Sequence, residues 1–308
     1  MKTKAIIRIV LYCIVILLLV SILGGVLLFD LYSADHHELS WVAPIVVPGT
    51  GYGMEGTYTA EGDPAAHIDI EWAAGAIIIQ TGDVDQIQIT ESGEFDAGEA
   101  LVYHQNGSKL TIRYQEENVY FGLQSTPSKD LTVTVPRDWE GKSIEIDAAS
   151  AEVELRNITV REAEFNGASG ACVFTGCTVE ELDIDTASGD VEFSGFLGKL
   201  ELDSMSAVFR GNFHSCPRSL EINSMSGDVE LSLPSNCGFT AQVDALSGNF
   251  DTDFHCSQRD GRYIHGDGSC RISLSGMSGD IFISQGDDIC YGKSTCHNQN
   301  GHYSDHHE

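Results

Sequence analysis

The sequence predicts an all-β fold, a parallel β-solenoid in which coils of about 19 residues stack on one another. Three observations indicate this fold. From about residue 65 onward, apolar and polar residues alternate with a period of two, as in strands that bury one face. Seven segments of similar sequence recur at nearly constant spacing. The chain has 32 glycines and no amphipathic helix pattern of useful length, which favours tight turns. A β-sandwich of antiparallel strands is the alternative that these observations leave open.

The first element is an apolar segment, residues 9–29, that predicts one transmembrane helix. Apart from a tyrosine and a serine it is apolar or small throughout, and its length as a helix crosses a hydrocarbon core of roughly 30 Å. Two lysines and an arginine lie within residues 1–8, so we expect a cytoplasmic N-terminus and an extracytoplasmic remainder at the cell membrane. A cleaved signal peptide is the competing interpretation, but its apolar region usually spans only about 7–15 residues.

Beyond the membrane segment, residues 30–64 show little periodicity, and we interpret them as a stalk or linker. All 46 acidic residues follow the apolar segment, together with only 14 of the 17 basic residues. Such an excess of carboxylates repels phosphate backbones, so we expect no nucleic-acid partner. The same charge attracts cations outside the membrane.

The repeat occupies most of residues 65–289, the predicted β-repeat domain. Its seven copies share a serine, at Ser150, Ser169, Ser188, Ser206, Ser226, Ser247 and Ser278, with gaps of 19, 19, 18, 20, 21 and 31 residues. A more distant copy begins at Ile68 and has Ala74-Gly75 at the shared position. A repeat this short cannot bury its own apolar face, so neighbouring copies must stack.

Stacking in register predicts columns of side chains. We expect one inward column at Ile146, Phe165, Ile184, Leu202, Ile222, Val243 and Leu274. We expect a second, directly before the serines, at Ala149, Ala168, Ala187, Met205, Met225, Leu246 and Met277, where the growing side chains indicate a core that widens toward the C-terminus. Ser-Gly or Ser-Ala then marks a bend, since glycine tolerates the required backbone angles.

The region from 84 to 136 breaks the repeat and predicts an N-terminal cap. Asn106-Gly107 lies between two alternating segments, as in a β-hairpin with a primed turn. Leu131 to Pro136 is a further strand. Antiparallel strands here would protect the open edge that a solenoid otherwise exposes.

These segments also carry a family resemblance. The succession of LTVTVP from Leu131, IEIDAASAEVEL from Ile144, LDIDTASGDVEF from Leu182 and LEINSMSGDVEL from Leu220 resembles the bacterial β-strand-repeat domain family of unknown function that is catalogued as candidate adhesins. The resemblance covers roughly residues 65–285. It implies a β-repeat domain exposed at the cell surface or envelope, often behind a membrane anchor, and it supplies no catalytic motif. The 31-residue gap before Ser278 and the Cys/His-rich tail depart from the pattern.

No motif in the sequence indicates catalysis. Seven serines at one repeated position indicate a turn requirement, because a nucleophile needs one placed base and one oxyanion hole. The sequence has no Gly-x-Ser-x-Gly elbow, phosphate loop or His-Glu-x-x-His zinc motif. We therefore expect a protein that is not an enzyme.

The carboxylates predict a charged ladder. Stacked coils would place Glu145, Glu164, Asp183, Glu201 and Glu221 in one outward column. Like charges on neighbouring strands repel, so either solvent screens the ladder or divalent cations bind it, and calcium prefers such clustered oxygens. We interpret a second column, Asp147, Asn166, Asp185, Asp203, Asn223 and Asp244, as a ladder of turn residues.

Eight cysteines follow Cys13, an even number in a region where disulfides can persist. We interpret Cys172 and Cys177 as buried free thiols. The remaining candidates for disulfides are Cys216 with Cys237 on adjacent coils, Cys256 with Cys270 across the long final gap, and Cys290 with Cys296 around a small loop. Their connectivity does not follow from the sequence.

The tail, residues 290–308, contains His297, His302, His306 and His307, whose side chains suit zinc, copper or nickel although their spacing matches no defined site. Taken together, the sequence predicts a membrane-anchored, adhesin-like binding or scaffolding module for protein or glycan partners. Envelope-stress sensing with membrane partners, or a cation-stabilised structural module, is the alternative.

Overall fold

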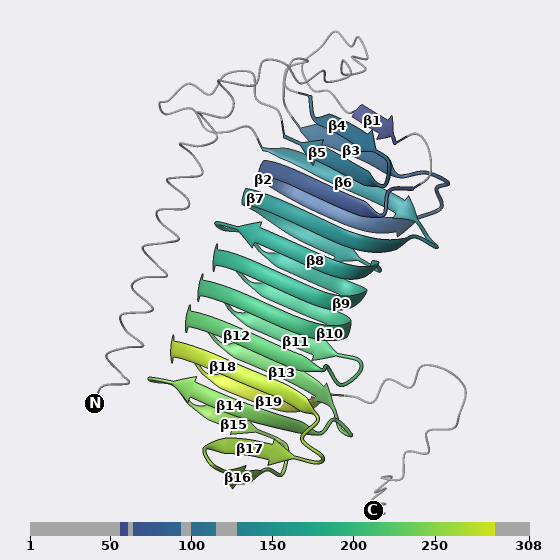
Figure 1. Ribbon diagram of the computed structural model, residues 1–308. Helices are drawn as coiled ribbons and strands as arrows, with labels where there is room; N and C mark the ends of the chain where they lie inside the picture. The colour runs from purple at the N-terminus through teal and green to yellow at the C-terminus, as the bar shows by residue number, and fades with distance from the viewer. Residues whose placement is uncertain (1–55, 61–63, 94–99, 115–127, 287–308) are drawn as a thin grey trace, which may run out of the picture. The chain divides into compact units, whose positions relative to one another are not determined.

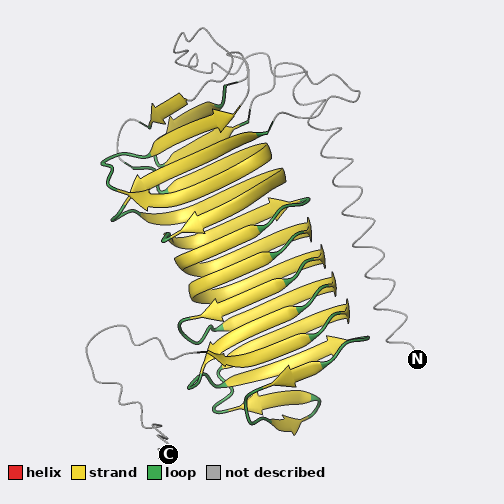
Figure 2. Ribbon diagram, turned by 180° about the vertical axis from the view of Figure 1, so that it is seen from behind, coloured by secondary structure: helices red, strands yellow, loops and turns green. Residues whose placement is uncertain are grey.

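The computed structural model describes residues 56–60, 64–93, 100–114 and 128–286, which form strands joined by turns (Figures 1 and 2). Within these ranges there is no helix, and hence none that is long and apolar enough to cross a membrane. The predicted transmembrane helix at 9–29, most of the stalk and the tail at 290–308 lie outside the described residues.

The central part of the domain is a stack of rungs, each of which is one coil of the chain. A rung has one strand segment before the Ser-Gly or Ser-Ala bend and one after it. We call the stack of segments before the bend the first sheet and the stack after it the second sheet. The central rungs are formed by β7 (Glu140–Arg156), β8 (Thr159–Gly167), β9 (Cys172–Ser188), β10 (Val191–Ser206), β11 (Phe209–Phe213), β12 (Ser219–Ser226) and β13 (Val229–Pro234).

The rungs pair in parallel, as the repeat predicts. Phe165 lies opposite Ile146 on one side and Ile184 on the other. The same column continues to Leu202 and Ile222. Residues 18 to 20 positions apart in sequence are therefore neighbours across a pair of strands, and the expectation of parallel stacking is confirmed.

At the C-terminal end the order of the rungs in space differs from their order in the chain. The segments concerned are β14 (Phe239–Ala245), β15 (Phe250–Thr252), β16 (Ser257–Arg259), β17 (Arg262–His265), β18 (Cys270–Ser278) and β19 (Ile281–Gly286). β18 pairs with β12 on one side and with β14 on the other, so the last coil lies between two coils that precede it in sequence. The 31-residue gap contains the β16–β17 hairpin, whose strand β17 pairs antiparallel with β14 (Figure 1).

The N-terminal end has a related arrangement. Its strands are β1 (Gly56–Thr59), β2 (His67–Gly82), β3 (Gln88–Gly93), β4 (Val102–Asn106), β5 (Lys109–Arg113) and β6 (Lys129–Pro136). β2 pairs in parallel with β7 on one side and with β5 and β6 on the other. Antiparallel pairs then join β4 to β5, β3 to β6 and β1 to β3, which form the cap that the hairpin signal predicts.

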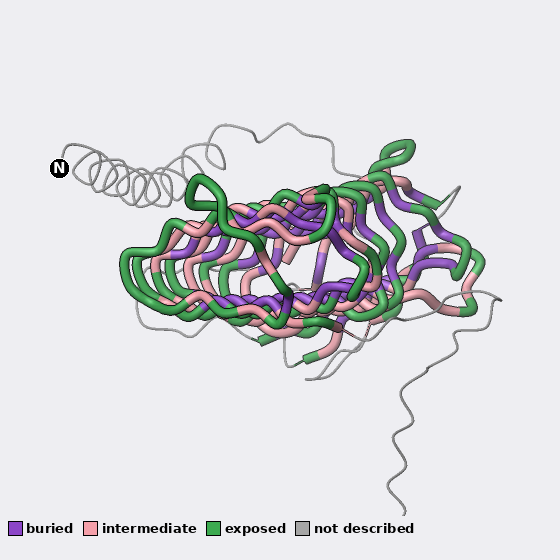
Figure 3. Tube along the Cα trace, turned by 90° about the horizontal axis from the view of Figure 1, so that it is seen from below, coloured by how far each residue is buried: buried purple, intermediate pink, exposed green. Residues whose placement is uncertain are grey.

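The core lies between the two sheets (Figure 3). The first predicted inward column is confirmed: its members are buried, apart from the partly buried Val243 on the terminal rung. The second is wrong, because Met205, Leu246 and Met277 are 37%, 52% and 39% exposed. In a strand, residues an odd number of positions apart face opposite sides, so Ala149 cannot point inward together with Ile146. The residue before each serine lies instead at the outer corner of the bend.

Candidate functional site

The outer side of the first sheet carries the predicted carboxylate ladder. Glu145 lies opposite Glu164, which lies opposite Asp183, and the column continues to Glu201 and Glu221. Asp69 of β2 extends it by one more rung beyond Glu145. A carboxylate therefore occupies this position on six consecutive rungs.

The Asp/Asn column lies beside the ladder, two residues further along each strand. Asp147, Asn166, Asp185, Asp203 and Asn223 are register partners on successive strands, so they belong to the strand face and not to the turn that we expect from the sequence. We call the two columns together the acidic face; its members are Asp69, Glu71, Glu145, Asp147, Glu164, Asn166, Asp183, Asp185, Glu201, Asp203, Glu221 and Asn223.

The two asparagines reduce the repulsion locally. Asn166 Nδ2 donates to Asp147 Oδ1 at 3.0 Å and to Glu164 Oε1 at 3.1 Å. Asn223 Nδ2 donates to Asp203 Oδ1 at 2.9 Å. An amide donor between two carboxylates separates like charges and satisfies an acceptor at the same time.

Three cations lie on this face, mostly near its N-terminal end. Lys109 Nζ is 2.7 Å from Asp69, and an Arg113 nitrogen is 2.9 Å from Glu71. Lys199 Nζ is 3.0 Å from Glu201 in the middle of the stack. All are at least partly exposed, so each pair contributes little to stability.

Burial and the neighbouring carboxylates raise the pKa values of three acidic side chains on the acidic face. Burial and then the neighbouring carboxylates Asp69, Glu164 and Asp147 raise the pKa of Glu145 above its ordinary value. Burial raises the pKa of Asp183 and of Asp185 as well, with further contributions from the acidic side chains on adjacent rungs. These groups favour a proton or another positive charge more than a free carboxyl group does.

The bend that separates the sheets is held by the residues of the Ser-Gly-Asp sequence. Ser247 Oγ donates to the Met277 carbonyl at 3.0 Å, so this repeated serine bonds the next rung. Asp280 Oδ1 accepts from the backbone N–H of Asn249 at 2.8 Å, and Asp228 Oδ1 accepts from that of Asp280 at 2.8 Å. The aspartate after the glycine therefore joins rungs, a role that we did not predict but that its recurrence in the repeats could have indicated.

The outer side of the second sheet carries a polar column that the sequence analysis missed. Thr175, Ser194, Asn212, Ser232 and Ser284 occupy one outward position on successive rungs. They line a shallow concavity of about 370 Å³, which we call the second-face groove. The column was visible in the aligned repeats as a hydroxyl or amide one residue after each inward phenylalanine or its counterpart.

Arg210 lies beside this polar column. One of its nitrogens is 3.3 Å from both Asp190 and Glu192, and another is 3.8 Å from Glu230. A side chain held between carboxylates of the two neighbouring rungs keeps its guanidinium on the surface of the groove. The exposed ring of Phe282 lines the same groove.

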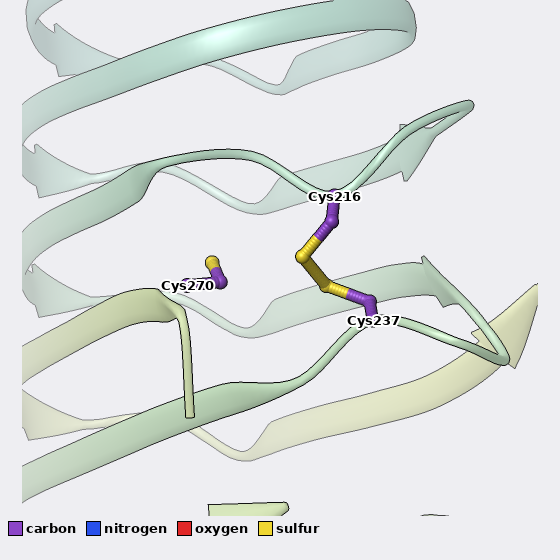
Figure 4. A group of neighbouring side chains, drawn as sticks. All are labelled: Cys216, Cys237 and Cys270. Carbon is purple, nitrogen blue, oxygen red and sulfur yellow. A yellow bond between two sulfur atoms is a disulfide. The ribbon is translucent and has the colours of Figure 1, made fainter. Parts of the chain in front are cut away.

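The cysteines fall into two groups. Cys216 and Cys237 are joined by a disulfide with a Cα–Cα distance of 5.2 Å. Cys256 and Cys270 are not joined, which corrects the pairing expected across the final gap. Cys270 instead lies beside the Cys216–Cys237 disulfide because β18 is inserted next to it (Figure 4).

Cys172 and Cys177 are buried free thiols. Cys290 and Cys296 lie outside the described residues, as do His297, His302, His306 and His307. Among the side chains that the structure describes, the group whose ligand atoms all lie within 4.8 Å of one another is Cys216, Cys237 and Cys270, and two of these sulfur atoms are joined in the disulfide.

A protein-family model matches most of the β-repeat domain. Residues 65–284 match the family model described as Toastrack DUF4097. No curated protein matches the sequence.

Solved bacterial structures are similar at low identity. A candidate adhesin from Bacteroides fragilis is 14% identical, with 77% of this chain and 98% of that chain covered and a TM-score of 0.48. A candidate cell adhesion protein from Clostridium sporogenes is 12% identical, with 76% and 100% covered and a TM-score of 0.38. A candidate lipid binding protein from Parabacteroides distasonis is 14% identical, with 76% and 98% covered and a TM-score of 0.35.

Proposed function

The chain belongs to the Toastrack DUF4097 family, and from this premise we propose that it is a non-enzymatic, adhesin-like binding module anchored in the cell membrane. Its partner is an extended polymer, a glycan or a polypeptide, that lies along the second-face groove. The observation that carries this proposal is the polar column of the groove, which offers one hydroxyl or amide per rung.

The shape and chemistry of the groove suit such a ligand. A shallow surface gains affinity from contact along its length, whereas a small substrate needs a concave pocket that encloses it. The outward side chains of the groove recur with the strand spacing of about 4.8 Å. Hydroxyl and amide groups both donate and accept hydrogen bonds, as the hydroxyl groups of a sugar chain or the peptide groups of a polypeptide require.

Binding of cell-wall glycans and of extended peptides to the purified full-length chain tests the proposal. The double variant Asn212→Ala/Ser232→Ala removes two adjacent polar groups, and we expect it to weaken binding roughly tenfold. The matched control is Asn223→Ala, which removes an amide from the acidic face on the opposite side. Equal affinity of the two variants, or no binding by the unmodified chain, would count against the groove.

An extracytoplasmic location is supported by two features of the chain. The apolar segment at 9–29 follows a cationic flank, which favours a cytoplasmic N-terminus. The Cys216–Cys237 disulfide suits an oxidising compartment. Protease added to intact cells should degrade the β-repeat domain, and protection of the domain would contradict this location.

The absence of catalysis is also part of the proposal. The repeated serines most easily mistaken for nucleophiles bond to neighbouring rungs: Ser188 Oγ donates to the Ala168 carbonyl at 3.4 Å, and Ser247 makes the equivalent bond. Hydroxyls engaged in this way hold the bend together.

A second candidate function, a cation-stabilised structural or sensing module, is favoured by the raised pKa values of Glu145, Asp183 and Asp185. Burial is the largest cause of these raised pKa values, and repulsion between carboxylates on adjacent rungs adds to it. Calcium bound between neighbouring rungs would relieve that repulsion. We expect a higher melting temperature in millimolar calcium than in EDTA, and a smaller difference in Asp183→Asn/Asp185→Asn. Equal melting temperatures in the two solutions would exclude this role.

A further inference from the structure

Three cysteines lie together around β18, the inserted coil, although a structural disulfide needs only two. The sulfur atoms of Cys216, Cys237 and Cys270 all lie within 4.8 Å of one another. Two of them share a disulfide and the third is a free thiol. Figure 4 shows the Cys270 side chain beside the bonded pair, on the strand of a neighbouring rung.

We propose that Cys216, Cys237 and Cys270 form a thiol–disulfide exchange site that presents Cys216 as a surface attachment point for a disulfide-bearing partner. The topology brings these residues together. Cys216 precedes β12, Cys237 precedes β14, and Cys270 begins β18, which lies between those two strands. The Cys270 backbone N–H donates to the carbonyl of Gly238, the residue after Cys237, at 2.9 Å.

The exchange step is internally balanced. The Cys270 sulfur, as thiolate, attacks Cys237 Sγ; a Cys270–Cys237 bond forms and the Cys216–Cys237 bond breaks. The electron pair of the broken bond leaves on Cys216, which takes up a proton in place of the one that Cys270 released. One disulfide and one thiol are present before and after, so neither an oxidant nor a reductant is consumed.

Burial sets the direction of the attack. Cys270 and Cys237 are buried, whereas Cys216 is partly exposed. A leaving thiolate is better stabilised where water reaches it, so Cys216 is a better leaving group than Cys237. Exchange in this direction moves the free thiol from the core to the surface.

Burial also explains why the resting protein keeps the Cys216–Cys237 bond. Desolvation raises the pKa of the Cys270 thiol to about 12, so only a small fraction is thiolate near neutral pH. Exchange is therefore slow in the closed structure. Once Cys216 is free, its thiolate attacks an external disulfide, forms a mixed disulfide with one half of it and expels the other half as a thiolate.

Oxidised glutathione provides a defined test on the full-length chain purified without reductant. After incubation and an acid quench, free thiols are alkylated in denaturant and the disulfide-linked peptides are mapped. We expect glutathione on Cys216 together with a Cys237–Cys270 disulfide. Glutathione on Cys237 or Cys270, or an unmodified Cys216, would overturn the proposal.

Two variants complete the test. Cys270→Ser removes the attacking thiol and should lower the modification of Cys216 by about tenfold or more. The matched control, Cys172→Ser, changes a buried thiol several rungs away and should leave the modification of Cys216 unchanged. Equal modification in Cys270→Ser and the unmodified chain would overturn the internal exchange. The map of the unmodified chain decides the matter alone if Cys270→Ser does not fold.

Discussion

At the scale of single residues, the bend glycines combine two constraints that no other amino acid meets. Gly279 has a φ of 135°, and a Cβ built on it would lie 2.0 Å from the carbonyl oxygen of Gly227 on the next rung. Gly248 is placed in the same way against Gly279. At these glycine positions the close approach of the neighbouring rung leaves no room for a side chain.

Gly279→Ala should therefore reduce the free energy of unfolding by more than about 1 kcal/mol, because it adds both backbone strain and a clash with a carbonyl group. The control is Gly107→Ala in the hairpin, where φ is 58° but no heavy atom lies within 4 Å of the added Cβ. Urea denaturation of both variants separates the two effects. A cost for Gly279→Ala no larger than that for Gly107→Ala would show that the contact between rungs is unimportant.

A second residue-scale feature is a fully buried ion pair at the N-terminal cap. Lys129 Nζ lies 3.0 Å from Glu91 Oε1, and neither side chain is exposed. The Leu101 backbone N–H donates to Glu91 Oε2 at 2.8 Å, and the ammonium lies 3.9 Å from the ring centroid of Tyr114. The pair joins β3 to the start of β6 inside the cap.

Lys129→Met should destabilise the protein by about 3–5 kcal/mol, because it leaves the Glu91 carboxylate buried without its cation. The double variant Glu91→Leu/Lys129→Met removes both charges and should recover much of this loss. Thermal unfolding of both variants measures the difference. A double variant less stable than Lys129→Met would contradict the explanation.

At the scale of the strand, the acidic face makes stability depend on pH in an unusual direction. Glu145, Asp183 and Asp185 have raised pKa values in the folded protein, so the folded state holds their protons more tightly than the unfolded state does. Their contribution is fully present below the ordinary carboxyl pKa and is lost as the pH rises through the raised folded values. We expect the protein to gain stability from these three groups as the pH falls from 7 toward the ordinary carboxyl pKa of about 4.

Asp183→Asn tests this account at pH 7. Removing one of the stacked charges should stabilise the protein by on the order of half a kcal/mol and flatten the pH dependence. Glu154→Gln is the control, since Arg156 lowers the pKa of Glu154 and its removal should not stabilise. Urea denaturation across this pH range measures both. A destabilised Asp183→Asn would indicate that the ladder contributes favourably as a charged unit.

The strands also show what a repeat can and cannot predict. The inward column through Ile184 and the outward ladder through Asp183 both follow from aligning the copies, because alternation and parallel register fix them together. The prediction that the residues directly before the serines point inward is wrong. They lie three positions after the first column, and residues an odd number of positions apart face opposite sides of a strand. Their exposed members, Met205, Met277 and Leu246, form an apolar edge at the bend.

At the scale of the whole molecule, the sequence does not reveal the spatial order of the coils. Equal spacing predicts that neighbours in sequence are neighbours in space, and this holds from β7 to β13. It fails at both ends, where β18 is inserted between β12 and β14, and β2 between β6 and β7, although the two flanking segments belong to successive parts of the chain in each case. All copies share one alternation of apolar and polar residues, so any two of them can pair in register. The alternation therefore cannot specify which pairs form.

The inserted coil should couple its two neighbours. Leu274 is 1% exposed and lies between Ile222 of β12 and Val243 of β14. Leu274→Ala should cost about 2–5 kcal/mol and increase amide hydrogen exchange in both β12 and β14. Val243→Ala on the terminal rung is the matched control and should affect β14 and β18 while sparing β12. Unchanged exchange in β12 for Leu274→Ala would contradict the coupling.

The insertion of β18 between β12 and β14, and of β2 between β6 and β7, limits how the domain can gain length. In the central stretch an additional nineteen-residue copy between β9 and β10 would meet a complete partner on each side, so duplication there extends the stack without altering other pairs. At either end of the stack, a new copy that follows β18 or β2 along the chain would find no unpaired edge beside that strand. Both β18 and β2 already pair with a strand on each side. Growth of this architecture by duplication is therefore restricted to its middle, and its two extremities are expected to change mainly by substitution.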